Sequence, residues 1–565
     1  MKKRNCYSQI AGFKQLVLAL KIYLNYGAVY AQRGLVLVLI MVILKDDLNA
    51  QTDQKQTVGQ IALQESTIPI RPGEPGKVPF WNVASKRFIY APAFDFKTVQ
   101  KAVKYKYQLT SETDGSKHEF ESSIPYAPLS PVWAAVPVGY FQIKVTGVSA
   151  NGDISATTGE GRYYRAAPFN GIYHQPVMPY DKSAMVALEK LMHKDFIEYW
   201  LSHKVPDPNY NLYRYPTKIY SAVIIGALTY GKLKPSEEKR SIQLARTIAD
   251  FMISISLPKG NPYQYFPPSY YGYEEIFKRS NSKINTSSIM TIIPADAGNA
   301  YLNLFDVTKD KKYLEAAKRI AETYTKTQME NGSWYLFVNK DSGQPTAANI
   351  AIPTSTINYF DRLRKDYKMK GLEKATEKAF KWIMENPVRT FDWHGQFEDI
   401  YERPPYHNLS REQACDMAIY LLRNSKENPE NIKLAEELIR FSEDQFVIWE
   451  KPPQDLTIGK EGLGAMSKNW ISPSVQEQYV YWMPVGRAAG IMLNTYFEAY
   501  KFTKKDMYLA KAKSIANSFT VVQKEHGGDY PTYFTKYKMN YWLNSAVYPA
   551  KVMMELAENL RTIKK

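Results

Sequence analysis

Lys311 to Gln328 reads KKYLEAAKRIAETYTKTQ and shows a helical period clearly. Leu314, Ala317, Ala321 and Tyr324 recur every three or four residues, so they lie on one stripe of a helix, with Lys, Arg and Glu opposite. Such a helix packs against a core on one side and faces water on the other. The stretch therefore predicts an outer helix of a larger helical assembly.

The same one-sided pattern returns at residues 237–255, 372–384, 432–446 and 506–523. Between these stretches lie helices that are small or apolar nearly all round, at residues 217–231, 292–305, 411–422 and 480–500. Helices of this second kind belong inside a protein. The alternation amounts to about twelve helices with an internal period of roughly 50–70 residues. It predicts a mainly α protein built as an (α/α)6 toroid, with an open solenoid as the alternative.

The connections between these helices differ in length. Inner-to-outer connections are short, such as residues 306–310 and 366–371. Outer-to-inner connections are long, and they cover residues 257–285, 329–349, 386–409, 447–477 and 524–540. In an alternating stack, all connections of one kind emerge on the same face, and unusually long loops often carry function. We therefore expect the functional site at one end of the toroid.

Residues 66–165 have the composition of β-strands instead. Stretches such as 103–111, 132–138 and 140–148 are rich in β-branched and aromatic residues and are separated by Gly, Pro and Asp. Asn151-Gly152 suits a hairpin turn. About seven strands predict a small β-sandwich of the immunoglobulin or fibronectin III kind. The predicted domains are a β-sandwich over 51–165, a linker over 166–180 and the toroid over 181–565.

The first fifty residues suggest targeting. Residues 34–44 are an apolar run that is short for a membrane span, and they follow several basic residues. The pattern predicts a secretory signal cleaved near Ala50, with an uncleaved membrane anchor as the alternative. Cys415 is then the one cysteine of the mature chain, which excludes an internal disulfide. We expect an exported protein, periplasmic or at the bacterial surface.

Composition narrows the class of partner. Without residues 1–50 the chain keeps 66 basic and 54 acidic residues, and this net charge of +12 favours acidic ligands. The sequence has no compact basic run typical of a nucleic-acid site and no Gly-rich phosphate loop. Aromatic residues make up 14% of the chain, with 43 tyrosines and 10 tryptophans. Rings in such number suit surfaces that bind ring-shaped ligands.

The five long loops share a composition that points to sugars. Each brings Trp or Tyr, and most bring a carboxylate. Aromatic faces stack on sugar rings, while carboxylates, amides and Arg bind hydroxyl groups. We therefore expect a carbohydrate ligand, although some of the rings are alternatively loop-packing residues. The candidate substrate-binding residues are Trp334, Trp393, Tyr401, Arg403, Tyr265, Tyr271, Trp470 and Trp482.

The loop at residues 393–408, WHGQFEDIYERPPYHN, is the densest in reactive groups. Glycoside hydrolysis needs one protonated carboxyl group and one ionised carboxylate. Glu398 and Asp399 are the leading catalytic candidates, although Glu398 is alternatively a salt-bridge partner of Arg403. A second carboxyl group must come from another loop, and the candidates are Asp296, Glu477, Glu274 and Asp529. Two acids have structural alternatives, a capping box for Glu477 and a helix N-terminal turn for Glu412.

His394 and His407 flank these carboxylates. In a polysaccharide lyase, His or Tyr removes the C5 proton of a neutralised uronate, so both histidines are catalytic candidates for that reaction. Their alternative role is hydrogen bonding to substrate. A metal site formed with Asp399 lacks a supporting spacing such as HExxH, and we expect no metal and no other cofactor. Arg487 is either a clamp for a carboxylate or part of a buried ion pair.

The order of domains adds a resemblance. A small β domain followed by a helical toroid with loops such as Asn331 to Phe337, NGSWYLF, resembles exported carbohydrate-active enzymes of polysaccharide-degrading Bacteroidetes, which are Gram-negative. Ala295 to Gly298, ADAG, is similar to the Asp-Ala-Gly of cellulases with the same two domains, but it lacks the second Asp and lies within a predicted helix. In this resemblance several toroid lyases carry their β domain after the helices instead.

The function expected from these observations is a glycoside hydrolase acting on a polysaccharide or oligosaccharide. The positive charge favours a substrate that contains uronic acids. A polysaccharide lyase is the second expectation, and a non-catalytic glycan-binding protein is the alternative from another class. The oligomeric state stays open.

Overall fold

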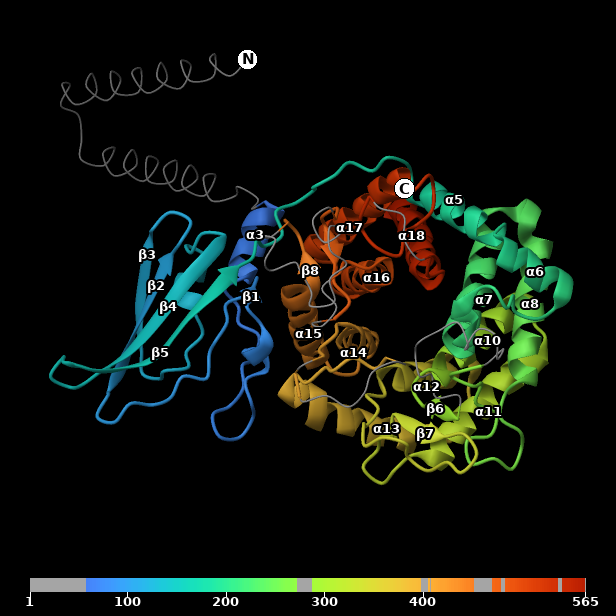
Figure 1. The fold of residues 1–565 in the computed structure, drawn as a ribbon, viewed down its shortest axis with the longest axis horizontal. Coiled ribbons are helices and arrows are strands. Elements are labelled where there is room, and N and C mark those ends of the chain that lie inside the picture. Colours follow the sequence, from blue (N-terminus) through green and yellow to red (C-terminus); the bar gives the residue numbers. More distant parts are fainter. Residues whose placement is uncertain are drawn as a thin grey trace, which may run out of the picture. The chain divides into compact units, whose positions relative to one another are not determined.

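The computed structural model describes residues 57–271, 287–397, 405–406, 408–451, 470–478, 483–536 and 541–563. A ring of paired helices dominates these residues (Figure 1). Six inner helices line its centre: α7 (Pro216–Leu233), α10 (Pro294–Thr308), α12 (Thr354–Tyr367), α14 (Glu412–Arg423), α16 (Gly486–Thr503) and α18 (Asn544–Ile563). Each packs on an outer helix: α8 (Glu238–Ser254), α11 (Lys311–Thr327), α13 (Glu373–Ile383), α15 (Glu430–Phe446), α17 (Asp506–Glu525) and α5 (Tyr180–Met192).

The ring is closed. Each inner helix contacts the next one along the chain, and the last, α18, contacts the first, α7, while the outer helix α5 packs on α18. An open solenoid would leave its first and last helix pairs apart. The (α/α)6 toroid is therefore the architecture of the helical region.

Burial follows the pattern that the sequence predicts. The inner helix α7 is buried nearly all round, whereas the outer helix α11 buries only one side, including Ala317, Ala321 and Tyr324. The inner helices are enclosed by their neighbours and by the outer layer, so polar side chains there need partners or a cavity.

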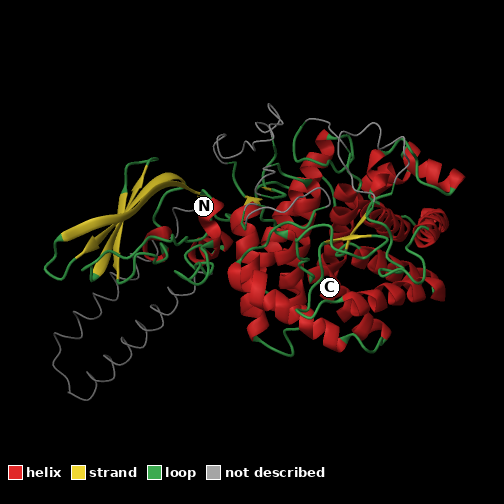
Figure 2. Cartoon of the chain, turned by 60° about the horizontal axis from the view of Figure 1, so that its bottom comes forward, coloured by secondary structure: helices red, strands yellow, loops and turns green. Residues whose placement is uncertain are grey.

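The β region forms a single five-stranded sheet in the part of the chain that the structure describes. Its order is β1-β5-β4-β2-β3, with β1 parallel to β5 and the other pairs antiparallel. The strands are β1 (Arg87–Phe88), β2 (Lys104–Ser111), β3 (Lys117–Ser122), β4 (Gly139–Val148) and β5 (Ile154–Arg165). Figure 2 shows the curl of this sheet. The predicted hairpin at Asn151-Gly152 joins β4 to β5.

The second sheet expected of a β-sandwich is absent from the described residues, so only a β domain, and not a sandwich, is confirmed. Irregular segments and a short helix, α4 (Ser130–Trp133), cover the apolar face of the sheet instead. Residues 132–138, predicted as a strand, begin inside α4 because Trp133 packs edge-on against Phe141 of β4. The burial of one aromatic ring outweighs the strand propensity of its neighbours.

Short elements complete the fold. They are the helices α3 (Val58–Glu65) and α6 (Asp195–His203), the 3-10 turns η1 (Trp81–Ala84), η2 (Asn211–Arg214) and η3 (Pro235–Glu237), the π-helical turn η4 (Met384–Val388), and the paired strands β6 (Ser288–Met290) with β7 (Phe337–Asn339) and β8 (Val447–Ile448) with β9 (Ser474–Val475). Both small ladders belong to the long outer-to-inner connections. No helix among the described residues is long and apolar enough to cross a membrane.

Candidate functional site

A cavity of about 240 Å³ opens among the inner helices. Every inner helix contributes to its wall, and each contributes side chains from its N-terminal half: Lys218, Asp296, Thr354, Glu412, Asp416, Arg487 and Tyr548 are examples. The long outer-to-inner connections reach the inner helices at these same N-terminal ends. Two loop residues, Gln396 and Phe397, also line the cavity. The cavity therefore lies at the end of the toroid where the sequence predicts the site.

Asp416 is an acid of the cavity wall with a strongly raised pKa. It lies in the second turn of α14, between buried residues on either side. Burial raises the pKa of Asp416, the negative charges of Glu412 and Asp296 raise it further, and the pKa reaches about 8 although Arg487 and Arg423 oppose the shift. Asp416 therefore keeps its proton at neutral pH and can donate it.

Glu412 lies one turn before Asp416 on the same helix, yet its ionisation is the opposite. The two carboxylate oxygens of Glu412, on α14, accept hydrogen bonds from both Nη groups of Arg487, on α16. The distance from Nη1 to Oε2 is 2.6 Å. Burial disfavours the charge on Glu412, but Arg487 outweighs burial and lowers the pKa of this carboxyl to about 2. Two acids with widely separated pKa values thus share one wall of the cavity.

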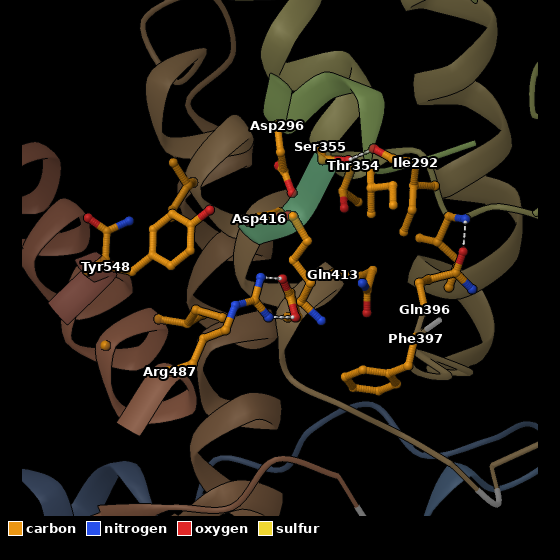
Figure 3. Close-up of a pocket in the computed structure, with 18 of the residues that line it drawn as sticks. Ile292, Asp296, Thr354, Ser355, Gln396, Phe397, Gln413, Asp416, Arg487 and Tyr548 are labelled. Carbon is orange, nitrogen blue, oxygen red and sulfur yellow. Dashed lines mark hydrogen bonds and ion pairs between the residues drawn. The ribbon is translucent and has the colours of Figure 1, made fainter. Parts of the chain in front are cut away.

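Asp296 and Tyr548 complete the group of reactive side chains. Asp296 lies in the first turn of α10, because ADAG follows Pro294 at the start of that helix. Its charge acts on Asp416, on Arg487 and on the hydroxyl of Tyr548, and burial together with Asp296 raises the pKa of Tyr548. Figure 3 shows Asp296, Asp416, Arg487 and Tyr548 around the same space.

Polar groups without charge also line the cavity. Gln396 is held in place because its side-chain oxygen accepts the backbone N–H of Ile352 at 2.9 Å. Gln413 accepts a hydrogen bond from the hydroxyl of Ser410 at 3.2 Å. These amides, with Thr354, offer donors and acceptors of the kind that bind sugar hydroxyls.

Among the predicted catalytic residues, the structure brings only Asp296 to this cavity in the part of the chain that it describes. His394 lies outside the lining residues and has Asp392 as an ion-pair neighbour at 3.7 Å. Glu398, Asp399 and His407 lie outside the described residues, although Gln396 and Phe397 directly before the first two line the cavity.

The predicted substrate-binding residues fall into three groups. Trp334, Trp393 and Trp470 are buried, so the core covers the ring faces that a sugar would need. Tyr265 lies under Arg319 and Tyr271 against Phe251, and neither lines the cavity. Tyr401, Arg403 and Trp482 lie outside the described residues.

The other acids weighed from sequence have separate surroundings. Asp529 pairs with Lys194 at 3.5 Å, and burial raises the pKa of Glu477, whose backbone carbonyl accepts a bond from Arg411. Glu274 lies outside the described residues. Glu412 is the first residue of α14, as expected of a helix N-terminal turn, but it also faces the cavity.

Sequence reasoning missed Asp416, Tyr548 and Lys218. A signal for Asp416 was present, since Glu412 and Asp416 are four residues apart in REQACDMAIYLL, an otherwise small or apolar helix. Two acids at that spacing share one face of a helix. On a helix expected to be buried, such a face must meet partners or a cavity. No group of three or more His, Cys, Asp or Glu suited to a metal ion occurs among the described residues.

Residues 286–458 match the family model described as the Ulvan lyase N-terminal domain. The match takes in less than a third of the chain, and it includes Asp296, Glu412 and Asp416. It agrees with the resemblance to carbohydrate-active enzymes of the toroid type. No curated protein matches the chain.

Several solved structures are similar to the chain at low sequence identity. A family 76 glycoside hydrolase from a bovine Bacteroides thetaiotaomicron strain is 11% identical with a TM-score of 0.46, over 81% of this chain and 94% of the other. A cellobiose 2-epimerase from Spirochaeta thermophila is 11% identical with a TM-score of 0.46, over 68% and 98%. A polysaccharide lyase is 11% identical with a TM-score of 0.38, over 82% and 64%. Similarity at this level does not decide the reaction.

Proposed function

We propose that this protein is a glycoside hydrolase that cleaves a polysaccharide or oligosaccharide in the cavity at the N-terminal ends of the inner helices. The observation that carries the proposal is the neutral Asp416 beside the negatively charged Asp296 in one cavity. Glycoside hydrolysis requires this division, one carboxyl group that holds a proton and one that does not.

The roles follow from the protonation states. Asp416 donates its proton to the glycosidic oxygen as the bond to the leaving sugar breaks. The carboxylate of Asp296 either removes a proton from an attacking water or attacks the anomeric carbon itself, after which water releases the sugar. Thr354, Gln396 and Gln413 are positioned to bind hydroxyl groups of the substrate. Each step uses a group that faces the cavity.

The family match supports a polysaccharide as the substrate, since the matched domain is named for a lyase of ulvan. The same match favours a second candidate reaction, β-elimination by a polysaccharide lyase. In that reaction the carboxylate of Asp296 would accept the proton at C5 of a uronate, because the raised pKa of Tyr548 keeps that hydroxyl protonated, and Asp416 would donate its proton to the leaving oxygen. The products separate the two: elimination creates an unsaturated uronate with a new ultraviolet absorbance, whereas hydrolysis creates only new reducing ends.

Two substitutions test the proposed roles. Asp416→Asn and Asp296→Asn should each lower kcat by roughly 10²–10⁴-fold, because each removes a proton-transfer group or a nucleophile. The measurement is the release of reducing ends from ulvan and from a panel of acidic and neutral polysaccharides. Asp306→Asn is the matched control, since Asp306 lies at the opposite end of α10 and accepts a hydrogen bond from Tyr367.

Full activity in Asp416→Asn would overturn the proposal. A glycan-binding protein would give a different result, namely retention of a glycan by wild type with no new reducing ends and no new absorbance. Export stays part of the proposal, on the ground of the targeting signal in residues 1–50. N-terminal sequencing of protein from the periplasm or medium of the expressing cells should find a chain that begins near residue 51.

A further inference from the structure

The ion pair between Arg487 and Glu412 lies directly beside the acid that we assign to proton donation. Both Nη groups of Arg487 donate to the two oxygens of Glu412, and the side chains of Arg487 and Glu412 are only 11% and 19% exposed. The ring of Tyr548 lies 5.6 Å from the guanidinium carbon. Such a two-point contact fixes the plane and the direction of the guanidinium group.

Two acids of the cavity wall are possible ion-pair partners for the guanidinium group of Arg487. Glu412 and Asp416 lie one helical turn apart on α14, and both line the cavity into which Arg487 points. Arg487 also acts electrostatically on Asp416, against the effect of burial. If the guanidinium group paired with Asp416 instead, it would lower the pKa of Asp416, and that residue would lose its proton.

The surroundings of Asp416 contain few other cations that could do the same. Charged and titratable groups on several elements face Asp416 or act on it electrostatically. They are Asp296 on α10, Glu412 and the more distant Arg423 on α14, Arg487 on α16, Lys218 on α7, and Tyr548 and Lys551 on α18. Lys551 pairs with Glu555 and Arg423 with Glu498. Among the cations, Arg487 has the largest electrostatic effect on the pKa of Asp416.

We propose that Glu412 is a positioning residue: by occupying both Nη groups of Arg487 it keeps the guanidinium from pairing with Asp416, and so leaves Asp416 able to hold and deliver a proton. The role of Glu412 in catalysis rests on the proposed function, but its effect on Asp416 does not. The carboxylate of Glu412 holds the guanidinium group of Arg487 in place, so the two residues act together.

The proton affinity of Asp416 can be measured without a substrate. Thermal unfolding of the full chain is followed across pH in four backgrounds: wild type, Glu412→Gln, Arg487→Gln, and the double variant. In each background the Tm is compared with that of the same protein carrying Asp416→Asn. This difference in Tm changes with pH only between the pKa of Asp416 in the unfolded chain and its pKa in the folded protein. The upper end of that pH range is the limit for Asp416, and it reports the pKa of that residue in the folded protein.

The two single variants should move this limit in opposite directions. In wild type it should lie near pH 8. Glu412→Gln removes a like charge and releases the arginine, so the limit should fall by about one pH unit or more. Arg487→Gln leaves the negative charge of Glu412 without its counter-ion, so the limit should rise. The double variant should return to within about half a unit of wild type, because both opposing charges are gone.

Asp306→Asn is the matched control. Asp306 and Arg362 also join two inner helices, α10 and α12, with a distance of 3.1 Å, and neither residue lines the cavity. This substitution should lower Tm without moving the limit for Asp416. Opposite shifts in the two single variants would not arise from a purely structural ion pair, which would change Tm equally at all pH values.

The inference is overturned if Glu412→Gln leaves the limit for Asp416 where it is in wild type. If Glu412→Gln does not fold, an unmoved or lowered limit in Arg487→Gln overturns it. The proposed function fails on a separate measurement, unchanged glycan cleavage by Asp416→Asn. Where activity is found, the alkaline limb of kcat/KM should follow the same order of variants, since it reports the essential acid of the free enzyme.

Discussion

The raised pKa of Asp416 lowers the stability of the fold at neutral pH. Its carboxyl group prefers the protonated form because burial and two neighbouring acids disfavour the charge. In the unfolded chain the same group ionises near its ordinary value of 3.8. Above that pH the native state therefore holds a proton that the unfolded state has released, and stability falls as the pH rises toward about 8. Strain of this kind is common where a residue has been placed for chemistry.

A stability prediction follows at this scale. Asp416→Asn cannot ionise, so its stability relative to wild type should grow by about 1.4 kcal/mol per pH unit between about pH 4 and about pH 8, to several kcal/mol above neutral pH, while the two should be nearly equal near pH 4. Differential scanning calorimetry between these pH values measures the difference. A gain of the same size at every pH would show that packing and not ionisation is responsible.

Glycines determine how closely the inner helices approach one another. Gly298, in the first half of α10, faces Tyr359 of α12, and a Cβ atom built at this position would lie 2.4 Å from the tyrosine hydroxyl oxygen. Tyr359 is fully buried and its hydroxyl donates to the carbonyl of Ala317, so it has little freedom to move. Gly226 makes a similar approach between α7 and Val547 of α18. The Gly of ADAG thus serves helix packing.

Gly298→Ala should lower the free energy of unfolding by about 1–3 kcal/mol, because the added methyl group overpacks the contact between α10 and α12. Without the tertiary contact the same change would favour the helix by up to about 1 kcal/mol. Val307→Ala, at a position 47% exposed on the same helix, is the control and should change stability by less than about 0.5 kcal/mol. Denaturant unfolding of the two variants separates packing from helix propensity, and a stabilised Gly298→Ala would contradict the prediction.

At the scale of the whole molecule, the chain on both sides of β1 is attached to the outer helix α15. One oxygen of Asp444, Oδ1, accepts the backbone N–H groups of Ile89 and Tyr90 at 2.6 and 2.7 Å. Arg71 adds an ion pair to Glu437 on the same helix at 2.7 Å. Burial raises the pKa of Asp444 to about 7, although the two N–H donors work against this. The β region and the toroid therefore share buried polar contacts as well as apolar ones.

Asp444→Ala should loosen this attachment, since it leaves two buried N–H groups without an acceptor at about 1–3 kcal/mol each. Asp444→Asn is the matched control because the amide oxygen can still accept both bonds. Hydrogen exchange at Ile89 and Tyr90, followed by mass spectrometry of the surrounding peptides, should speed up markedly in the alanine variant and much less in the asparagine variant. Equal exchange in the two would mean that the carboxylate charge, and not the acceptor, holds the segment.

The sequence by itself determined the local structure and the order of the helices. The stripe in Lys311 to Gln328 and the apolar helices between such stripes depend on residues three or four apart, so a linear reading detects them. The lengths of the connections also indicated the end of the toroid at which the cavity opens, and Asp296 was among the candidates that line this cavity. The β composition of residues 66–165 predicted strands but not the number of sheets, because covering one face of a sheet requires only apolar groups in any conformation.

The tertiary structure alone decided the chemistry of the site. Asp416 is unremarkable in its own helix, and its raised pKa comes from burial together with Glu412 one turn away and Asp296 and Arg487 on two other helices. Trp334 and Trp393 look in sequence like sugar-stacking residues, yet the core covers them. Electrostatic and packing energies depend on distances in space between distant parts of a chain, and closure of the helical ring sets those distances.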